Sequence, residues 1–297
     1  MDASNALGEF LRARRRLVRP EDVGIGISGT RRVEGLRREE VAMLAGISTD
    51  YYLRLEQGRD RNPSPQVLNA IARALTLDQA AADHMSGLTR AQGTHASART
   101  RSRGRAPRSE QVPQSIRELI DGWNGNPAWV QNRFFDVLAA NDLASALSPH
   151  YAPGVNLLAA AFLDPSERER RIDWELMTRK GVATLRALAG PDVDDPRLTE
   201  LVGELSLRSD RFRELWARHD VTPHTGQVSR LRHPQVGDLE LRSNKLTIAG
   251  SGGLILVVFH PEPGSRNAEL LQMLGNLSAS GRTAVGENRD RRATTER

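Results

Sequence analysis

Apolar residues recur at helical spacing in three short stretches between Leu36 and Leu75. Steps of three and four residues are typical of short helices that bury one face. The three stripes consist of Val41, Leu44 and Ala45, then Tyr52 and Leu55, then Leu68, Ile71, Ala72 and Leu75. This pattern predicts three consecutive helices that share one core.

Turn and cap residues separate these stripes. Gly46 suits a left-handed turn after the first helix, Ile47 is expected to pack across it, and Ser48 is a good N-cap for the second. After the loop "RDRNPSP", Ser64 is placed to cap a third helix that Pro65 starts. Two short helices joined by a glycine turn and supported by a third predict a helix-turn-helix. The residues left on the outer face of its second helix are Thr49, Asp50, Tyr51 and Arg54.

The pattern changes in the C-terminal half of the chain. Residues 114–123 are helical, residues 128–141 are typical of two short strands around a turn, and residues 155–219 are helical, with Leu198, Leu201, Val202 and Leu205 on one face. Three strands are then predicted over 224–234, 237–250 and 252–263, followed by a helix over 268–277. Strands at both ends of a helical middle predict an antiparallel sheet with helices, and an α+β fold overall.

Composition marks the domain boundaries. We expect a DNA-binding domain over 1–90, a flexible basic linker over 91–111, a second domain over 112–280 and a disordered tail over 281–297. We favour a soluble spacer for the linker, and the alternative is an arm that tracks phosphates. The linker arginines are Arg99, Arg101, Arg103, Arg105 and Arg108.

The charge of the chain is uneven. Residues 1–110 hold 19 Arg and no Lys against 13 Asp and Glu, a net charge of +6, so the remaining residues carry −1 of the total +5. A basic first third favours a polyanion partner. The chain has no cysteine, no apolar run long enough for a membrane span and no basic, apolar leader, so we expect a cytoplasmic, nucleoid-associated protein without membrane contact.

The stretch "GIGISG", residues 24–29, has the glycine spacing of a dinucleotide-binding loop. Such a loop needs a hydrophobic strand before it and a helix directly after it. Here a basic helical pattern broken by Pro20 precedes the glycines, and "TRRVEGLRREE" follows them. We therefore interpret the stretch as a flexible loop between two helices and expect no nucleotide cofactor.

With these motifs in place, residues 6–88 resemble the lambda-repressor-like, or XRE-type, helix-turn-helix family, through "AGIS", "LRLEQG" and "PSPQVLNAIARAL". Together with "VLAAN", "FRELWARHDV" and "HPQVGDLEL" in the second half, the chain is similar to MmyB-like regulators. The resemblance implies a five-helix DNA-binding domain, followed by a PAS-like domain that holds a small hydrophobic or fatty-acid-like ligand.

The resemblance also implies roles in DNA binding. Thr49, Asp50 and Arg54 match base-reading positions, although Asp50 instead has a partner available in Arg54, four residues on. Contacts with the phosphate backbone are implied for Arg38, Ser48, Arg59, Arg61 and Asn62. Tyr51 could contact either the backbone or a base. We also expect Arg31 and Arg32, just after the glycine-rich loop, to reach the backbone or the minor groove of double-stranded DNA. Because one small helix-turn-helix recognises a half-site, we expect a homodimer.

For the second domain, the shared residues of the family are Asn141, Arg213, Trp216 and His219, and Trp129 is a further candidate for the wall of a cavity. Buried polar side chains could anchor a carboxylate while aliphatic walls hold its tail. The alternatives are a structural network for the polar residues and core packing for the tryptophans. A domain that serves only dimerisation or protein interaction is the competing hypothesis.

Catalysis and metal binding lack support in the sequence. The chain has no Cys, no G-x-S-x-G motif and no paired carboxylates in a catalytic context, so we expect a protein that is not an enzyme. His219, His224 and His233 raise the question of a metal site, but no acid or cysteine completes a ligand set at standard spacing. We expect His219 to be a buried hydrogen-bonding residue.

Overall fold

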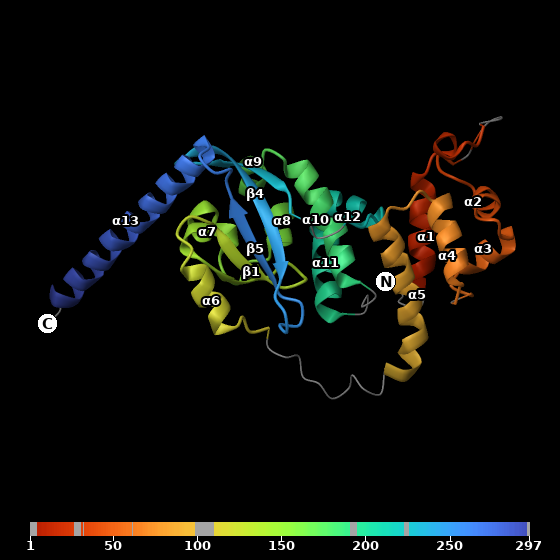
Figure 1. The fold of residues 1–297 in the computed structure, drawn as a ribbon, viewed down its shortest axis with the longest axis horizontal. Helices are drawn as coiled ribbons and strands as arrows, with labels where there is room; N and C mark the ends of the chain where they lie inside the picture. The colour runs from red at the N-terminus through yellow and green to blue at the C-terminus, as the bar shows by residue number, and fades with distance from the viewer. Residues whose placement is uncertain are drawn as a thin grey trace. The chain divides into compact units, whose positions relative to one another are not determined.

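A computed structural model describes the backbone of residues 5–26, 31, 33–60, 62–98, 110–190, 195–222 and 226–295, and the side chains of these residues except 90–98 and 281–295. The chain forms two compact units (Figure 1). Unit 1 contains Met1–Ala106 and Arg179–His224, and unit 2 contains Pro107–Thr178 and Thr225–Arg297. The helices and the antiparallel sheet confirm the α+β fold.

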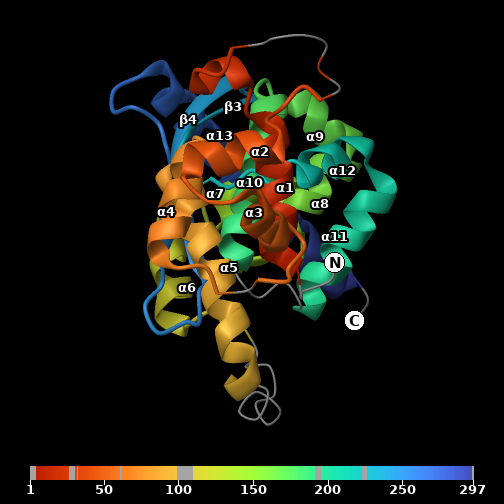
Figure 2. The same ribbon diagram turned by 90° about the vertical axis from the view of Figure 1, so that its right-hand side faces the viewer.

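Unit 1 is helical. Its N-terminal part has the five α-helices that we expected, together with a 3-10 helix, η2 (Figure 2). Their bounds are α1 (Ala6–Leu17), η2 (Pro20–Val23), α2 (Arg38–Ala45), α3 (Thr49–Glu56), α4 (Pro65–Ala74) and α5 (Gln79–Ala98). The end of α10 (Trp174–Ala189), with α11 (Pro196–Arg208) and α12 (Asp210–Ala217), completes this unit. The two units therefore do not coincide with the predicted domains, because residues 179–224 of the predicted second domain belong to unit 1. The domain boundaries given from the sequence stay a prediction.

The three predicted stripes form the core of unit 1, with one exception. Tyr52, Leu55 and the stripe of α4 are buried together with Phe10 of α1. In α2, however, Leu44 is 38% exposed, so its assignment to the stripe was wrong. Ala42 takes its place, because this two-turn helix contacts both α3 and α4 and therefore buries positions 41, 42 and 45.

Unit 2 is built on a five-stranded antiparallel sheet with the strand order β2-β1-β5-β4-β3. The strands are β1 (Ala128–Gln131), β2 (Val137–Ala140), β3 (Val228–His233), β4 (Gly237–Thr247) and β5 (Ile255–His260), and all five were predicted. Side chains of β3 alternate strictly between exposed and buried, as expected for a sheet covered on one face.

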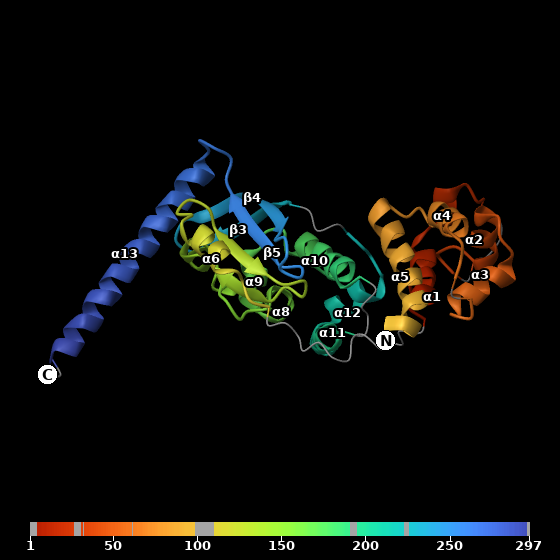
Figure 3. The ribbon, with the colours of Figure 1, turned by 60° about the horizontal axis from the view of Figure 1, so that its bottom comes forward.

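Helices connect and cover this sheet. The chain passes from α6 (Gln114–Asp121) through β1 and β2 into the helical middle, which has the bounds α7 (Asp142–Leu147), η3 (Pro149–Tyr151), α8 (Leu157–Leu163), α9 (Pro165–Arg170) and the start of α10. The last helix, α13 (Arg266–Thr295), contacts α7 and β4 and then extends as one straight helix into the segment for which we predict disorder (Figure 3). None of the described helices has the length and hydropathy of a membrane span.

The glycine-rich stretch follows η2, not a strand. Gly24 adopts φ +75° and its N–H donates to Glu21 O and Pro20 O, so it ends the 3-10 turn. Residues 27–30 lie outside the described residues. A dinucleotide-binding loop would follow a β-strand, and here a 3-10 helix precedes the glycines. The sequence pattern before the glycines also argues against such a loop.

Candidate functional site

The turn between α2 and α3 has the geometry of a helix-turn-helix. Gly46 adopts φ +65°, and its N–H donates to Ala42 O and Met43 O. The Ser48 hydroxyl then accepts a hydrogen bond of 3.1 Å from Tyr51 N and caps α3. Both features confirm the sequence prediction, as does the Ser64 cap of α4.

A buried carboxylate fixes the end of α3. Glu56 is fully buried, and its oxygens accept hydrogen bonds of 2.7 Å from Arg15 Nε of α1 and from Arg38 Nε of α2. Burial raises the pKa of the Glu56 carboxyl, but the two guanidinium groups more than offset this and the pKa is lowered. Arg15 also donates to Leu36 O at 2.8 Å. The ion pairs therefore tie α3 to both α1 and α2.

The outer face of α3 carries the residues predicted to read bases. Thr49 and Asp50 are exposed at its N-terminus. Asp50 pairs with Arg54, which was the alternative to a base contact, and the Arg54 guanidinium lies 5.6 Å from the centre of the Tyr51 ring. Tyr51 is half-buried and packs against the core of unit 1, so it faces outward less than expected. Arg54 is thus held over the exposed surface of the helix.

The other residues predicted to contact DNA differ in exposure and in the partners of their side chains. Arg59, Asn62 and Arg38 are exposed, but Arg38 is bonded to Glu56. Arg31 makes two 2.8 Å contacts with Glu40 and donates to Gly35 O at 3.1 Å. This pairing lowers the pKa of Glu40, with the hydrogen bond from Arg31 as the largest cause. Arg32 and Arg61 lie outside the described residues.

Two of the predicted ligand contacts lie in the core of unit 2. Trp129 is buried, stacks on Tyr151 at 4.1 Å between ring centres and meets Phe259 edge-on at 5.0 Å. The buried Asn141 side chain caps α7 by accepting from Ala144 N at 2.9 Å. It also accepts from Ala128 N and donates to the carbonyl oxygens of Ile120, Trp123 and Asn126. Both residues have the contacts expected of structural roles.

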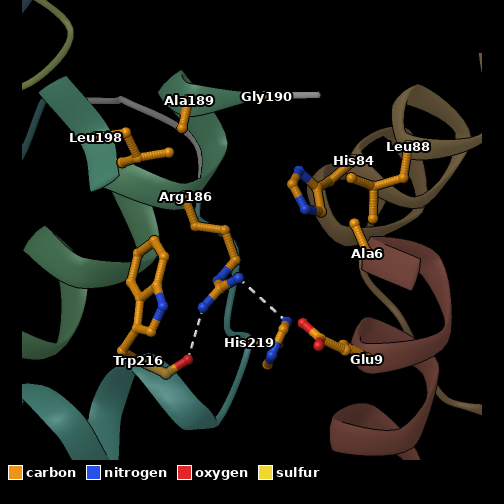
Figure 4. A pocket seen from close by; sticks show the side chains of 10 residues that line it. All are labelled: Ala6, Glu9, His84, Leu88, Arg186, Ala189, Gly190, Leu198, Trp216 and His219. Atoms are coloured by element: carbon orange, nitrogen blue, oxygen red, sulfur yellow. Dashed lines mark hydrogen bonds between the residues drawn. The ribbon is translucent and has the colours of Figure 1, made fainter. Parts of the chain in front are cut away.

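The other three predicted ligand contacts lie in unit 1. Arg213 of α12 is exposed, pairs with Asp210 at 2.6 Å and is not among the residues that line the pocket of Trp216 and His219. Trp216 and His219 line one pocket together with Arg186 of α10, which the sequence analysis missed (Figure 4). Arg186 donates to Trp216 O at 2.6 Å and to His219 Nδ1 at 3.1 Å. The structure therefore places Arg186 where we expected Arg213.

Burial dominates the electrostatics of this pocket. Arg186 is 6% exposed, and desolvation lowers its pKa to about 9, although the charges of Asp220 and Glu9 oppose this. Burial is also the largest cause that lowers the pKa of His219 to about 3 and that of His84 to about 4, and the Arg186 charge adds to both shifts. At neutral pH the pocket thus holds one cation and two neutral imidazoles beside the Glu9 carboxylate.

Comparison with known proteins identifies both parts of the chain. A family described as "Helix-turn-helix domain" matches residues 6–85, and a family described as "MmyB-like transcription regulator ligand binding domain" matches residues 112–274, more than half of the chain. The chain belongs to the MmyB-like transcription regulators. No curated protein matches it significantly. This MmyB-like regulator thus combines a helix-turn-helix domain, which is a DNA-binding module, with a ligand-binding domain.

The sequence held weak signals for the residues that were missed. Arg15 and Arg186 each interrupt an apolar helix face, Arg15 four residues after Leu11 and Arg186 four residues after Val182. A charged group at such a position needs a buried polar or charged partner. The sequence therefore predicts that a partner exists but does not identify the residue. In the MmyB-like regulator these partners come from segments distant in the sequence, so spacing alone could not find them.

The histidines form no metal site within the described part of the chain, where no three His, Asp or Glu are placed to hold an ion. His219 is hydrogen-bonded and largely buried, as predicted. His233 is buried with Nε2 3.0 Å from Ala146 O, and His224 lies outside the described residues. His150 lies between Asp164 and Glu167 at 2.7 and 2.9 Å. Each of these three rings therefore has an ordinary structural partner.

Proposed function

We propose that this MmyB-like regulator binds specific double-stranded DNA sequences as a homodimer and responds to a small hydrophobic, fatty-acid-like ligand. The observation that carries the DNA-binding part is the capped α3, which exposes Thr49, Asp50 and Arg54 at one surface while Tyr52 and Leu55 hold its other face in the core. A short helix so mounted fits the major groove and reads base edges from its N-terminal half. Such a protein would work in the cytoplasm, on the nucleoid.

The family description and the five-stranded antiparallel sheet with helices inserted between β2 and β3 support a PAS-like ligand-binding domain over 112–280. One observation favours the competing proposal, in which this domain serves dimerisation or protein interaction. Trp129, Tyr151 and Phe259 pack ring against ring in unit 2. Native mass spectrometry of the chain purified from cells separates the two proposals, because a bound lipid and the oligomer each add a defined mass. A dimer without added mass supports the competing proposal.

Selection of bound duplexes from a random DNA library tests the DNA-binding part. We expect two half-sites whose centres lie about 10 base pairs, or a multiple of that distance, apart. Recovery of no enriched sequence at low salt contradicts the proposal. On the selected duplex, the double variant Arg31→Ala, Arg32→Ala should weaken binding to all sequences alike and reduce the salt dependence of affinity. Arg213→Ala, which removes an exposed arginine of α12, is the matched control and should leave both unchanged.

A further inference from the structure

Arg186 is a buried cation without a carboxylate partner. Among the described residues, no Asp or Glu forms an ion pair with it, and its hydrogen bonds go to one carbonyl oxygen and one neutral imidazole. Its guanidinium carbon lies 3.9 Å from the centre of the Trp216 ring. A buried charge is costly unless an opposite charge compensates it. Asp220 and Glu9 attract the guanidinium without forming an ion pair with it, so the environment of Arg186 favours an anion closer than either carboxylate.

Two further donors at this place lack acceptors. Within the described residues, Arg186 Nε and Trp216 Nε1 are buried and have no hydrogen-bond partner. Both side chains line the same pocket, together with Glu9, His84 and His219 (Figure 4). Buried donors are rarely left unsatisfied in folded proteins. An oxyanion would accept from both and neutralise the guanidinium as well.

The size and walls of the pocket limit the anion. Its volume is about 30 Å³, which holds about two water-sized oxygens. Ala6, Leu88, Ala189 and Leu198 supply apolar walls around the polar groups. A carboxylate has two such oxygens and one charge, so the pocket fits this head group, and a longer carbon chain would have to extend out of it past these walls. Bidentate contact with carboxylates is also the geometry that guanidinium groups favour.

The pocket joins the DNA-binding helices to the helices of the C-terminal half within unit 1. Ala6 and Glu9 come from α1, and His84 and Leu88 come from α5, whereas the arginine and the indole come from α10 and α12 (Figure 4). Glu9 carries the carboxylate that interacts electrostatically with Arg186 from the DNA-binding side. A carboxylate ligand would compete with this interaction.

We propose that the pocket around Arg186 binds the carboxylate of a small organic acid, with Arg186 and the Trp216 indole as donors, and that its occupancy changes DNA affinity through α1. This inference deepens the proposed ligand response and rests on it. The bound carboxylate replaces the attraction of Glu9 for Arg186, so α1 loses one of its attachments to α10. Since α1 holds Glu56 at the end of α3 through Arg15, a shift of α1 reaches the recognition helix.

Titration calorimetry on the delipidated full chain tests the site with three probes. Sodium octanoate supplies the carboxylate with a chain, sodium acetate supplies the carboxylate alone, and 1-octanol supplies a chain without charge. Octanoate should bind and octanol should not. Acetate affinity near that of octanoate assigns the site to a free small acid, and much weaker acetate binding assigns it to the head group of an apolar ligand. Equal binding of octanol and octanoate, or no binding of either acid, overturns the inference.

Four variants locate the binding. Arg186→Met should weaken octanoate binding by about a hundredfold and Trp216→Phe, which keeps the aromatic face, by about tenfold, since hydrogen bonds to charged groups are strong. Glu9→Gln removes the competing carboxylate and should tighten binding by about threefold. Arg213→Met is the matched control and should leave affinity unchanged. If Arg186→Met does not fold, the opposite shifts of Trp216→Phe and Glu9→Gln still decide, and unchanged affinity in both contradicts the inference.

DNA affinity with and without octanoate then tests the coupling. We expect octanoate to change the affinity of the wild-type chain for its selected duplex and to leave that of the Arg186 and Trp216 variants nearly constant. An equal response of wild type and variants refutes the pocket while the proposed ligand response stands. A wild-type chain that binds octanoate but selects no DNA sequence refutes the proposed function and leaves the carboxylate site in place.

Discussion

The buried Glu56 carboxylate allows a sharp test of how the recognition helix is held. In Glu56→Gln the side chain keeps its shape but loses the charge that two arginines face. Arg15 is 9% exposed at its side chain and would keep only neutral acceptors, the Leu36 carbonyl and the Gln side-chain oxygen. Arg38 is 44% exposed and can regain water. The unfolding cost therefore comes mainly from Arg15.

The size of this effect follows from the burial of each partner. Removing one member of a buried ion pair costs about 3–5 kcal/mol, and an exposed pair contributes less than about 1 kcal/mol. Because one of the two arginines stays close to solvent, we expect the low end, about 3 kcal/mol. A free-energy loss of this size corresponds to about a hundredfold increase in the population of the open state.

Amide hydrogen exchange of peptides from α3, followed by mass spectrometry, measures this opening directly. Exchange in Glu56→Gln should accelerate by about a hundredfold. The control is Glu39→Gln, since Glu39 is 63% exposed and lies 3.8 Å from Arg37, and its exchange should change by less than about threefold. If the Glu56 variant behaves like this control, the ion pairs do not hold the helix and the reasoning fails.

Three further perturbations test the remaining parts of unit 1. Arg54→Ala should reduce discrimination at one base pair by about tenfold or more in competition binding, and equal weakening on all sequences would assign Arg54 to phosphate instead. In Gly8→Ala the new Cβ would lie 2.2 Å from Glu56 O, so urea unfolding should show a clear loss of stability, whereas the control Gly87→Ala, with nothing within 4 Å, should gain up to about 1 kcal/mol. The pKa values of His84 and His219 are lowered to about 4 and about 3, so unfolding at pH below about 6.5 takes up protons that the folded state does not bind. The free energy of unfolding should thus be about 2–3 kcal/mol smaller at pH 5.5 than at pH 7.5, and a His84→Gln variant with the same pH dependence as wild type would contradict this assignment.

Local signals in the sequence predicted the local structure well. Gly46 and Ser48 specify a turn and a cap through their own backbone and side-chain chemistry, so a single stretch of chain contains the whole cause. The strands and the helical middle were also predicted, because alternation and helical spacing are properties of short windows. Leu44 shows the limit, since only the directions from which α3 and α4 approach α2 decide which side of a two-turn helix is buried.

Contacts between distant segments could not be predicted in the same way. The resemblance pointed to Arg213, but the buried guanidinium is that of Arg186, and the sequence places both on helices with apolar faces. The choice depends on which arginine the packing of α10 against α12 turns inward. Likewise, the sequence offered Arg31 to DNA, and the structure pairs it with Glu40. The position of an arginine in the sequence indicates that its side chain will have a partner. Only the fold determines which residue that partner is.

Helix α1 shows why the net charge of the first third of the chain overstates the number of arginine side chains available to contact DNA. It carries four arginines and one glutamate, yet Arg15 faces Glu56 and Arg14 pairs with Asp220 at 2.5 Å. These two charges tie α1 to the recognition helix and to the segment that follows α12, and Glu9 on the same helix interacts with Arg186. A helix with its charged groups engaged on both sides cannot shift at one side without strain at the other. The charge pattern that suggested phosphate contacts therefore contributes instead to the connection by which a bound carboxylate would reach α3.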